Sequence, residues 1–195
     1  MFDLLSRPAT EVAPLLLGAV LRVGDVAVRL TEVEAYLGEV DPGSHAFRGP
    51  GKRNAVMYGP PGHLYTYFTY GMHTCANVVC MPEGVASGVL LRAGEVIEGA
   101  GIARERRTTS RTPFDLAQGP ARLTVALDIR LEDAGSNLET GRVRLELPAA
   151  PAPFSAGPRT GVSGDGGSDE YPWRFWIPGE PSVSPYRPAV KRQRA

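Results

Sequence analysis

A carboxylate and several aromatic side chains stand close together in the first part of the chain, in a pattern suited to chemistry on a nucleotide. Glu34 precedes Tyr36 by two residues, and a strand-like run from Tyr65 to Met72 carries further tyrosines before Asn77 and Arg92. An enzyme that pulls a base from a duplex must stack the base and attack its sugar, which requires such side chains. The pattern predicts chemistry on DNA.

The second carboxylate of this segment, Glu32, raises a different possibility. Two glutamates could act as the acid and base of a sugar hydrolase, but side chains at positions i and i+2 of a strand lie roughly 7 Å apart and point in parallel. A single carboxylate that deprotonates water is the better use, and we assign it to Glu34. The alternative is that Glu34 only pairs with an arginine such as Arg92, and we expect Glu32 to be structural.

The tyrosines have two interpretations. Tyr65 and Tyr67 alternate along a predicted strand, which is typical of packing between strands as well as of a platform for a base. A base stacked on an aromatic ring contributes ~1–3 kcal/mol, which offsets part of the cost of unstacking it. Tyr70 and Met72 flank a glycine at an apparent hairpin tip. That position favours a wedge inserted into the minor groove.

The overall charge argues against binding to DNA, because 21 basic and 21 acidic residues cancel. Contact with phosphates then requires a local basic patch. Arg48, Lys52 and Arg53 lie in a glycine-rich loop between the two aromatic motifs, and we predict that they contact DNA. A second cluster from Arg104 to Arg111 is equally consistent with a solvated surface.

The elements that must position these residues follow from turn signals and periodicity. The Gly24-Asp25 pair predicts a hairpin of strands Ala19–Val23 and Val26–Tyr36. A period of two places Val28, Leu30, Glu32, Glu34 and Tyr36 on one face, where two glutamates break the ordinary pattern of a core strand.

The rest of the chain predicts a mainly antiparallel sheet with helices. We expect strands at 62–70, 74–80, 85–92, 142–147 and 173–177, and helices at 10–17, 95–107 and 119–127, of which the last lies near the site. We also expect a long loop at 41–62 and a frayed tail at 186–195. A Pro- and Gly-rich loop at 148–171 has little power to bury apolar surface. Residues 159–162 are the part of the 148–171 loop expected to reach the site.

Length and composition predict one domain, residues 1–195, with an ordinary core. The first residues lack a basic segment, and the apolar stretch from Val12 to Leu21 is too short to span a bilayer. Cys75 and Cys80 lack metal-site spacing, and we expect them to be reduced core residues. The protein is therefore expected in the cytoplasm, associated with the nucleoid.

The order of motifs resembles the alkyladenine (3-methyladenine) DNA glycosylase family. The resemblance rests on Thr31-Glu-Val-Glu34-Ala-Tyr36-Leu-Gly38, His45, Pro61-Gly-His-Leu-Tyr-Thr-Tyr67-Phe-Thr-Tyr70-Gly-Met72, Asn77 and Val89-Leu-Leu-Arg92-Ala. It is close from about Leu15 to Gly99. The later segments around Arg122 and Trp173 fit more loosely.

The resemblance implies an α+β fold, a curved, mainly antiparallel sheet with flanking helices and a protruding hairpin, like the C-terminal domain of formyltransferase. It implies a monomeric, monofunctional glycosylase that excises 3-methyladenine, hypoxanthine and 1,N6-ethenoadenine from double-stranded DNA without a metal or organic cofactor. The absence of a lysine at the motif positions speaks against lyase chemistry.

By position in the motifs, Glu34 would activate the water that attacks C1′ of the sugar, and Arg92 would help to hold that water. Tyr36, His45 and Tyr67 would sandwich the base, with His45 testing its edge by a hydrogen bond, and Asn77 would crowd the 2-amino group of guanine. The DNA contacts would include Tyr70, which fills the gap in the duplex, together with Met72, Arg48, Lys52, Arg53 and Arg122.

Two other classes of protein stay open at this point. A non-catalytic nucleic-acid binder would use the tyrosines to stack single-stranded or damaged bases and Glu34 as a structural residue. A carbohydrate hydrolase would use both Glu32 and Glu34.

Overall fold

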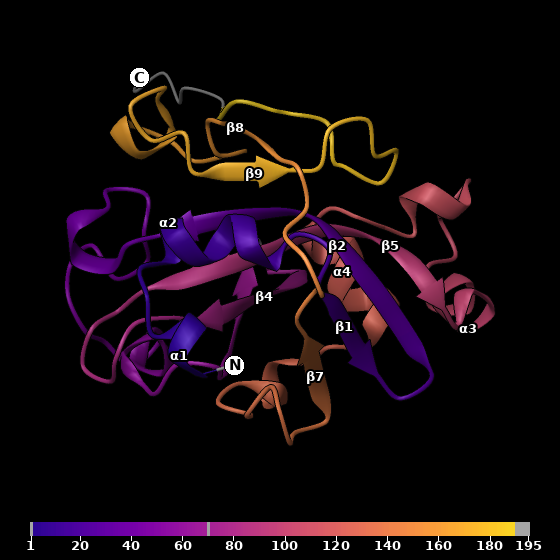
Figure 1. Cartoon of the computed structure of the whole chain (residues 1–195), viewed down its shortest axis with the longest axis horizontal. Helices are drawn as coiled ribbons and strands as arrows, with labels where there is room; N and C mark the ends of the chain where they lie inside the picture. Colours follow the sequence, from indigo (N-terminus) through magenta and orange to yellow (C-terminus); the bar gives the residue numbers. More distant parts are fainter. Residues whose placement is uncertain (1, 70, 190–195) are drawn as a thin grey trace.

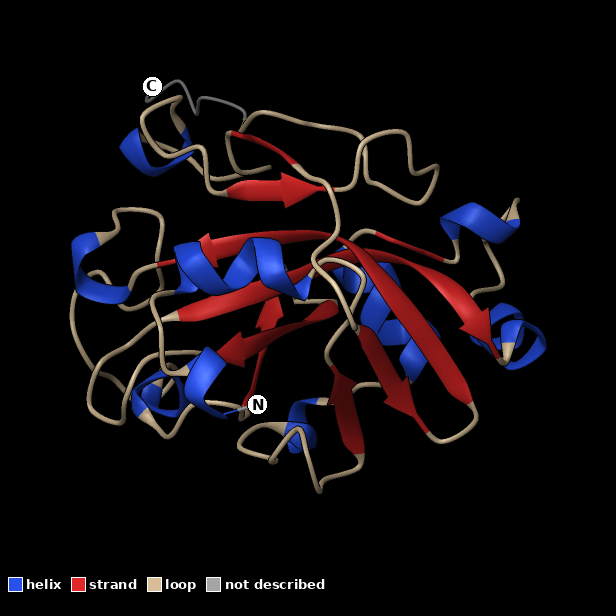
Figure 2. Ribbon diagram, viewed as in Figure 1, coloured by secondary structure: helices blue, strands red, loops and turns tan. Residues whose placement is uncertain are grey.

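The computed structural model describes residues 2–69 and 71–189, and its centre is a sheet of nine strands (Figures 1 and 2). The strands are β1 (Val20–Val23), β2 (Val26–Tyr36), β3 (Leu64–Thr69), β4 (His73–Val79), β5 (Gly88–Glu98), β6 (Ala117–Gln118), β7 (Val143–Glu146), β8 (Ser155–Gly157) and β9 (Arg174–Trp176). The main path runs β3-β4-β5-β2-β1-β7, with antiparallel pairs throughout the described strands. The expected α+β class is confirmed.

The helices in the described part of the chain are short. They are α1 (Phe2–Leu5), α2 (Ala9–Val12), α3 (Ala100–Arg106) and α4 (Pro120–Leu127). In Figures 1 and 2, α1 and α2 lie in front of the sheet and α4 lies behind its strands. Leu16, Val33 and Leu127 belong to one apolar cluster that joins helices to sheet.

Strand β2 is the spine of the sheet. It pairs with β5 along most of its length, while its first half also pairs with β1 and its second half with β9. The predicted face of Val28, Leu30, Glu32, Glu34 and Tyr36 is divided in the structure. Val28 and Leu30 belong to the same apolar core as Val33 and Ala35, whereas Glu34 and Tyr36 line a cavity. Pairing with β5 is irregular between Leu30 and Val33, the point where β2 passes from the core to this cavity.

The hairpin predicted from Gly24-Asp25 is present as β1 and β2. Strands β3 and β4 form a second hairpin that closes with Thr69 opposite His73. Gly71 takes a left-handed φ of 66° at its turn, a conformation that suits glycine. Tyr70, the expected wedge, lies outside the described residues.

Two predicted helices differ from the structure. The helix expected at 10–17 is α2 followed by a 3₁₀ turn at Ala13–Leu16, because Pro14 has no N–H for a regular helical bond. The helix expected at 95–107 begins only at Ala100, because residues 95–98 extend β5 and pair with β2. Gly99 lies so close to the first hairpin turn that a Cβ would come within 2.3 Å of the Asp25 carbonyl oxygen.

The Pro- and Gly-rich segment at 148–171 buries little apolar surface, as expected, since its buried residues are Arg159 and Gly166. It contributes β8, which pairs with β9, and a fully buried side chain, Arg159. The predicted tail at 186–195 lies partly outside the described residues, which end at 189.

Candidate active site

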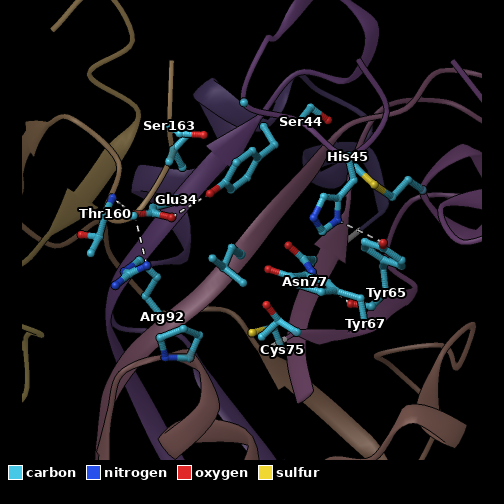
Figure 3. Close-up of a pocket in the computed structure, with 18 of the residues that line it drawn as sticks. Glu34, Ser44, His45, Tyr65, Tyr67, Cys75, Asn77, Arg92, Thr160 and Ser163 are labelled. Carbon is cyan, nitrogen blue, oxygen red and sulfur yellow. Dashed lines mark hydrogen bonds and ion pairs between the residues drawn. The ribbon is translucent and has the colours of Figure 1, made fainter. Parts of the chain in front are cut away.

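A cavity of about 360 Å³ opens where β2, β5, β4 and β3 lie side by side (Figure 3). This volume is within the usual range for a small-molecule site. Two loops and the start of α4 complete its wall. The lining residues are Glu34, Tyr36, Pro42, Gly43, Ser44, His45, Met57, Tyr65, Tyr67, Thr69, Cys75, Asn77, Leu90, Arg92, Pro120, Thr160, Gly161, Val162 and Ser163.

Glu34 is fully buried in the wall of this cavity, and three donors hold its carboxylate. The Tyr36 hydroxyl donates to Oε2 at 2.9 Å, and the Thr160 backbone N–H donates to Oε1 at 2.7 Å. Nη1 of Arg92 lies 3.3 Å from Oε1. These contacts leave the carboxylate one orientation, with both oxygens engaged and the side chain facing the hollow (Figure 3).

Tyr36, whose hydroxyl contacts the Glu34 carboxylate, is also affected by burial and by the charge of Glu34. Burial, and then the negative charge of Glu34, raise the pKa of the Tyr36 phenol well above its ordinary value. Its hydroxyl therefore stays protonated and remains a donor to the carboxylate at all pH values at which the protein would work.

Arg92 is oriented by Glu32 from the side away from the cavity. Its Nε donates to Glu32 Oε1 at 2.9 Å, and Arg174 Nε donates to the same oxygen at 2.6 Å. The Ser184 N–H donates to Glu32 Oε2 at 2.7 Å. Burial alone would raise the pKa of Glu32, but the two guanidinium groups outweigh it and lower that pKa. Glu32 is thus a charged, fully buried anchor for Arg92.

The two glutamates consequently have different surroundings. Both carboxylates contact Arg92 and have both oxygens engaged by protein donors, but Glu34 lines the cavity and Glu32 is absent from the lining. A hydrolase that needs both carboxylates at one bond does not fit this arrangement.

Aromatic rings form the opposite side of the cavity (Figure 3). The His45 and Tyr67 rings meet edge to face, with centroids 4.5 Å apart, and Tyr65 stacks beside Tyr67 at 5.7 Å. Nδ1 of His45 lies 3.3 Å from the Tyr65 hydroxyl. Partial loss of water around the ring, and then the charge of Arg53, lower the pKa of His45, which favours the neutral imidazole.

Two polar side chains of β4 complete this wall. Nδ2 of Asn77 donates to the Tyr65 carbonyl oxygen at 3.1 Å, which sets the orientation of the amide. Cys75 also lines the cavity, whereas Cys80 belongs to the apolar core. Both thiols are buried and free, as expected for reduced core residues, and Cys75 also borders the cavity.

The residues predicted to touch DNA are exposed wherever the structure describes them. Met72 is 69% exposed beside the hairpin turn, and Arg48, Lys52 and Arg122 are also exposed. Arg53 donates to the Phe68 carbonyl oxygen at 3.1 Å, which ties its loop to β3.

The sequence indicated most of the cavity but missed part of it. Of residues 159–162, which were expected to reach the site, Thr160, Gly161 and Val162 line the cavity and Arg159 does not. Pro120 at the start of α4 lies in the wall too. Tyr65 was not assigned to the site, although its alternation with Tyr67 was a signal for it. Asp41, the buried partner of Arg159, carried no local signal.

Within residues 2–69 and 71–189, no group of three or more His, Cys, Asp or Glu side chains is placed to hold a metal ion. None of the helices in those ranges is both long and apolar enough to cross a bilayer.

Comparison with known proteins adds independent information. The family model described as Methylpurine-DNA glycosylase (MPG) matches residues 3–181. A protein of Leifsonia xyli subsp. xyli named "Putative 3-methyladenine DNA glycosylase" is 59% identical over 194 residues, covering 95% of this chain and 91% of the relative. Proteins with the same name from Streptomyces avermitilis and Nocardia farcinica are 54% and 52% identical, covering 98% and 95% of this chain and 93% and 90% of their own lengths.

Proposed function

Because the chain belongs to the methylpurine-DNA glycosylase family and is therefore a DNA glycosylase, we propose that it flips alkylated or deaminated purines out of duplex DNA and hydrolyses their N-glycosidic bond with water activated by Glu34. The substrates include 3-methyladenine, hypoxanthine and 1,N6-ethenoadenine. The observation that carries the proposal is the buried Glu34 carboxylate, aligned by three donors in the wall of a cavity whose other side is aromatic.

The proposed reaction needs one carboxylate. Water attacks C1′ of the flipped nucleotide, its proton passes to Glu34, and the electron pair of the C1′–N bond leaves with the base. The negative charge of Glu34 also stabilises the positive charge that develops on the sugar. Arg92, held by Glu32, keeps the carboxylate in place and helps to position the water. Among residues 2–69 and 71–189, those that line the cavity include no lysine, in keeping with hydrolysis without lyase chemistry.

The base would lie between Tyr36 on the Glu34 side and the His45–Tyr67 pair on the other. An electron-poor methylated purine gains from stacking on tyrosine rings. If the Tyr65 hydroxyl donates to Nδ1 of His45, the neutral imidazole carries its proton on Nε2 and presents a donor to the edge of the purine. Asn77, with its amide fixed by Tyr65, would clash with the 2-amino group of guanine.

The surface around the cavity would bind the duplex. Exposed Arg48, Lys52, Arg53 and Arg122 would contact phosphates, and Met72 would insert beside the gap left by the base. Tyr70, which we propose fills this gap, lies outside the described residues. We propose that the protein acts as a monomer on damaged double-stranded DNA in the cytoplasm, at the nucleoid.

The test uses duplexes that carry a single hypoxanthine, ethenoadenine or methylated purine, followed by alkaline cleavage of abasic sites. We expect strand breaks with the wild-type protein and none with Glu34→Gln, while Glu34→Gln still binds the lesion duplex. Glu139→Gln, an exposed glutamate, is the matched control and should keep full activity. Lesion binding without excision by the wild-type protein would instead identify a non-catalytic binder and refute the proposal.

A further inference from the structure

Arg159 is a fully buried cation next to the residue whose amide contacts Glu34. It follows Pro158 in the Pro- and Gly-rich segment and does not itself line the cavity. Burying a guanidinium is costly unless it is paired and hydrogen-bonded. The contacts of Arg159 therefore indicate what its burial achieves.

The guanidinium of Arg159 joins two segments that are far apart in the sequence, its own loop at 159–166 and residues 35–41 at and after the end of β2. Nη1 and Nη2 donate to the two carboxylate oxygens of Asp41 at 2.6 and 2.7 Å. Nη1 also donates to the Ala35 carbonyl oxygen at 2.9 Å, directly beside Glu34 in β2. Nη2 and Nε donate to the Gly166 carbonyl oxygen at 2.7 and 3.1 Å, which closes the loop from 159 to 166. The planar fork of arginine suits this set of acceptors.

The same guanidinium supports the ring of Tyr36. Its central carbon lies 4.5 Å from the ring centroid, within the range of a cation–π contact. Tyr36 and Thr160 supply two of the three donors to Glu34, and Arg159 contacts the first and is bonded covalently to the second. The third donor, Arg92, is held separately by Glu32.

The aromatic side of the cavity does not depend on Arg159. The Asp41 carboxylate accepts hydrogen bonds from the backbone N–H groups of Leu37 and Gly43 at 3.1 and 2.8 Å. The turn around Asp41 is therefore held by hydrogen bonds that do not involve Arg159. His45 is held by Tyr65. Loss of the Arg159 contacts would therefore release the loop at 159–166 and loosen the Tyr36 ring, and it would leave the His45–Tyr67 side of the base site in place.

We propose that Arg159 is a positioning residue for excision, which aligns the Glu34 carboxylate by holding Thr160 and Tyr36 against it. The inference rests on the proposed role of Glu34. It predicts that a displaced loop slows the chemical step while binding of the lesion duplex is kept.

The first test replaces Arg159 by lysine, which keeps a positive charge near Asp41 but cannot reproduce the fork. Because a misplacement of about 1 Å in a catalytic group can cost on the order of 10²-fold in rate, we expect a loss of that order in single-turnover excision. The dissociation constant for the lesion duplex should stay close to the wild-type value. Thermal unfolding of each variant shows whether it is folded.

A second variant moves the same loop without removing any charge or hydrogen-bonding group. A Cβ at Gly166 would lie 2.4 Å from the Gly43 backbone nitrogen, and Gly166 does not have a positive φ. Gly166→Ala should therefore push the loop away and lower the excision rate with binding retained. Gly101→Ala, whose Cβ meets nothing within 4 Å, is the matched control and should behave as wild type.

Slow excision with retained lesion binding in folded Gly166→Ala supports the inference, whether or not Arg159→Lys folds. Wild-type excision by either folded variant overturns it, and so does a parallel loss of binding and rate. Glu34→Gln in the same assay separates the two proposals. If Glu34→Gln excises normally, the role of Glu34 itself fails, whereas an inactive Glu34→Gln beside fully active loop variants refutes only the role of Arg159.

Discussion

Replacing Glu32 by glutamine tests whether the buried charge behind the cavity holds Arg92 in place. The substitution keeps the size of the side chain and removes its negative charge. Arg92 and Arg174 then remain in the interior, with side chains only 8% and 6% exposed, and without the carboxylate that both contact. The Ser184 N–H also loses a charged acceptor.

The expected loss of stability follows from these contacts. Removing one partner of a buried ion pair destabilises a protein by about 3–5 kcal/mol, because a charge is left uncompensated. For a chain of this length about 1 kcal/mol shifts the melting temperature by roughly 2–4 °C, so a decrease of roughly 6–20 °C is expected. Urea unfolding at neutral pH gives the free energy directly, by linear extrapolation.

The effect should depend on pH with a definite sign. Because the pKa of Glu32 is lowered in the folded protein, its charge contributes stability above the ordinary carboxyl range. That contribution is lost as the pH falls through the lowered pKa. The difference between wild type and Glu32→Gln should be largest near pH 7 and should narrow as the pH falls below the ordinary carboxyl range and through the lowered pKa of Glu32.

Glu95→Gln provides the control on the same pair of strands. Glu95 contacts Arg29 at 2.7 Å, but its side chain is 42% exposed, and an exposed pair is worth about 1 kcal/mol or less. If Glu32→Gln loses no more stability than Glu95→Gln, or if its loss does not change with pH, the assigned role of Glu32 is wrong.

Three further substitutions test other parts of the structure. Asn77→Ser should increase the release of normal guanine from undamaged duplex on the order of tenfold, because it removes a steric clash. Chromatography of the free bases measures this release, and an unchanged release would contradict the clash. Arg53→Ala should raise the pKa of His45 toward, but not to, its ordinary value, since burial is the larger cause; an NMR titration that does not move excludes the contribution of Arg53. Gly94→Ala should lower the free energy of unfolding by about 1–3 kcal/mol, because its Cβ would lie 2.5 Å from the Arg29 carbonyl oxygen. An unchanged midpoint of urea unfolding would show that β2 and β5 can separate at low cost.

Local patterns predicted those parts of the fold in which neighbouring residues decide the structure. Gly24-Asp25 identified the first hairpin, and the alternation after Glu32 correctly separated core from cavity. The helix expected from Glu95 was wrong at its start because pairing with β2, which is distant in sequence, outweighs local propensity.

The missed parts of the cavity depend on contacts between distant segments. Spacing alone did not reveal that Glu32 is enclosed, because its partner Arg174 comes from β9. Arg159 and Asp41 are 118 residues apart, and each has the local sequence of a surface loop. Composition describes such a segment as irregular, but it does not show that one of its charges finds a buried partner.

The contact between Glu34 and Thr160 spans 126 residues, and this has a consequence for protein synthesis. During translation the carboxylate leaves the ribosome long before the amide that orients it, since chains emerge from the amino terminus. A nascent or prematurely terminated chain that ends before residue 160 would present the acidic group to DNA without its alignment. Under the proposed role of Glu34, base removal is expected only from chains that have been made beyond residue 160.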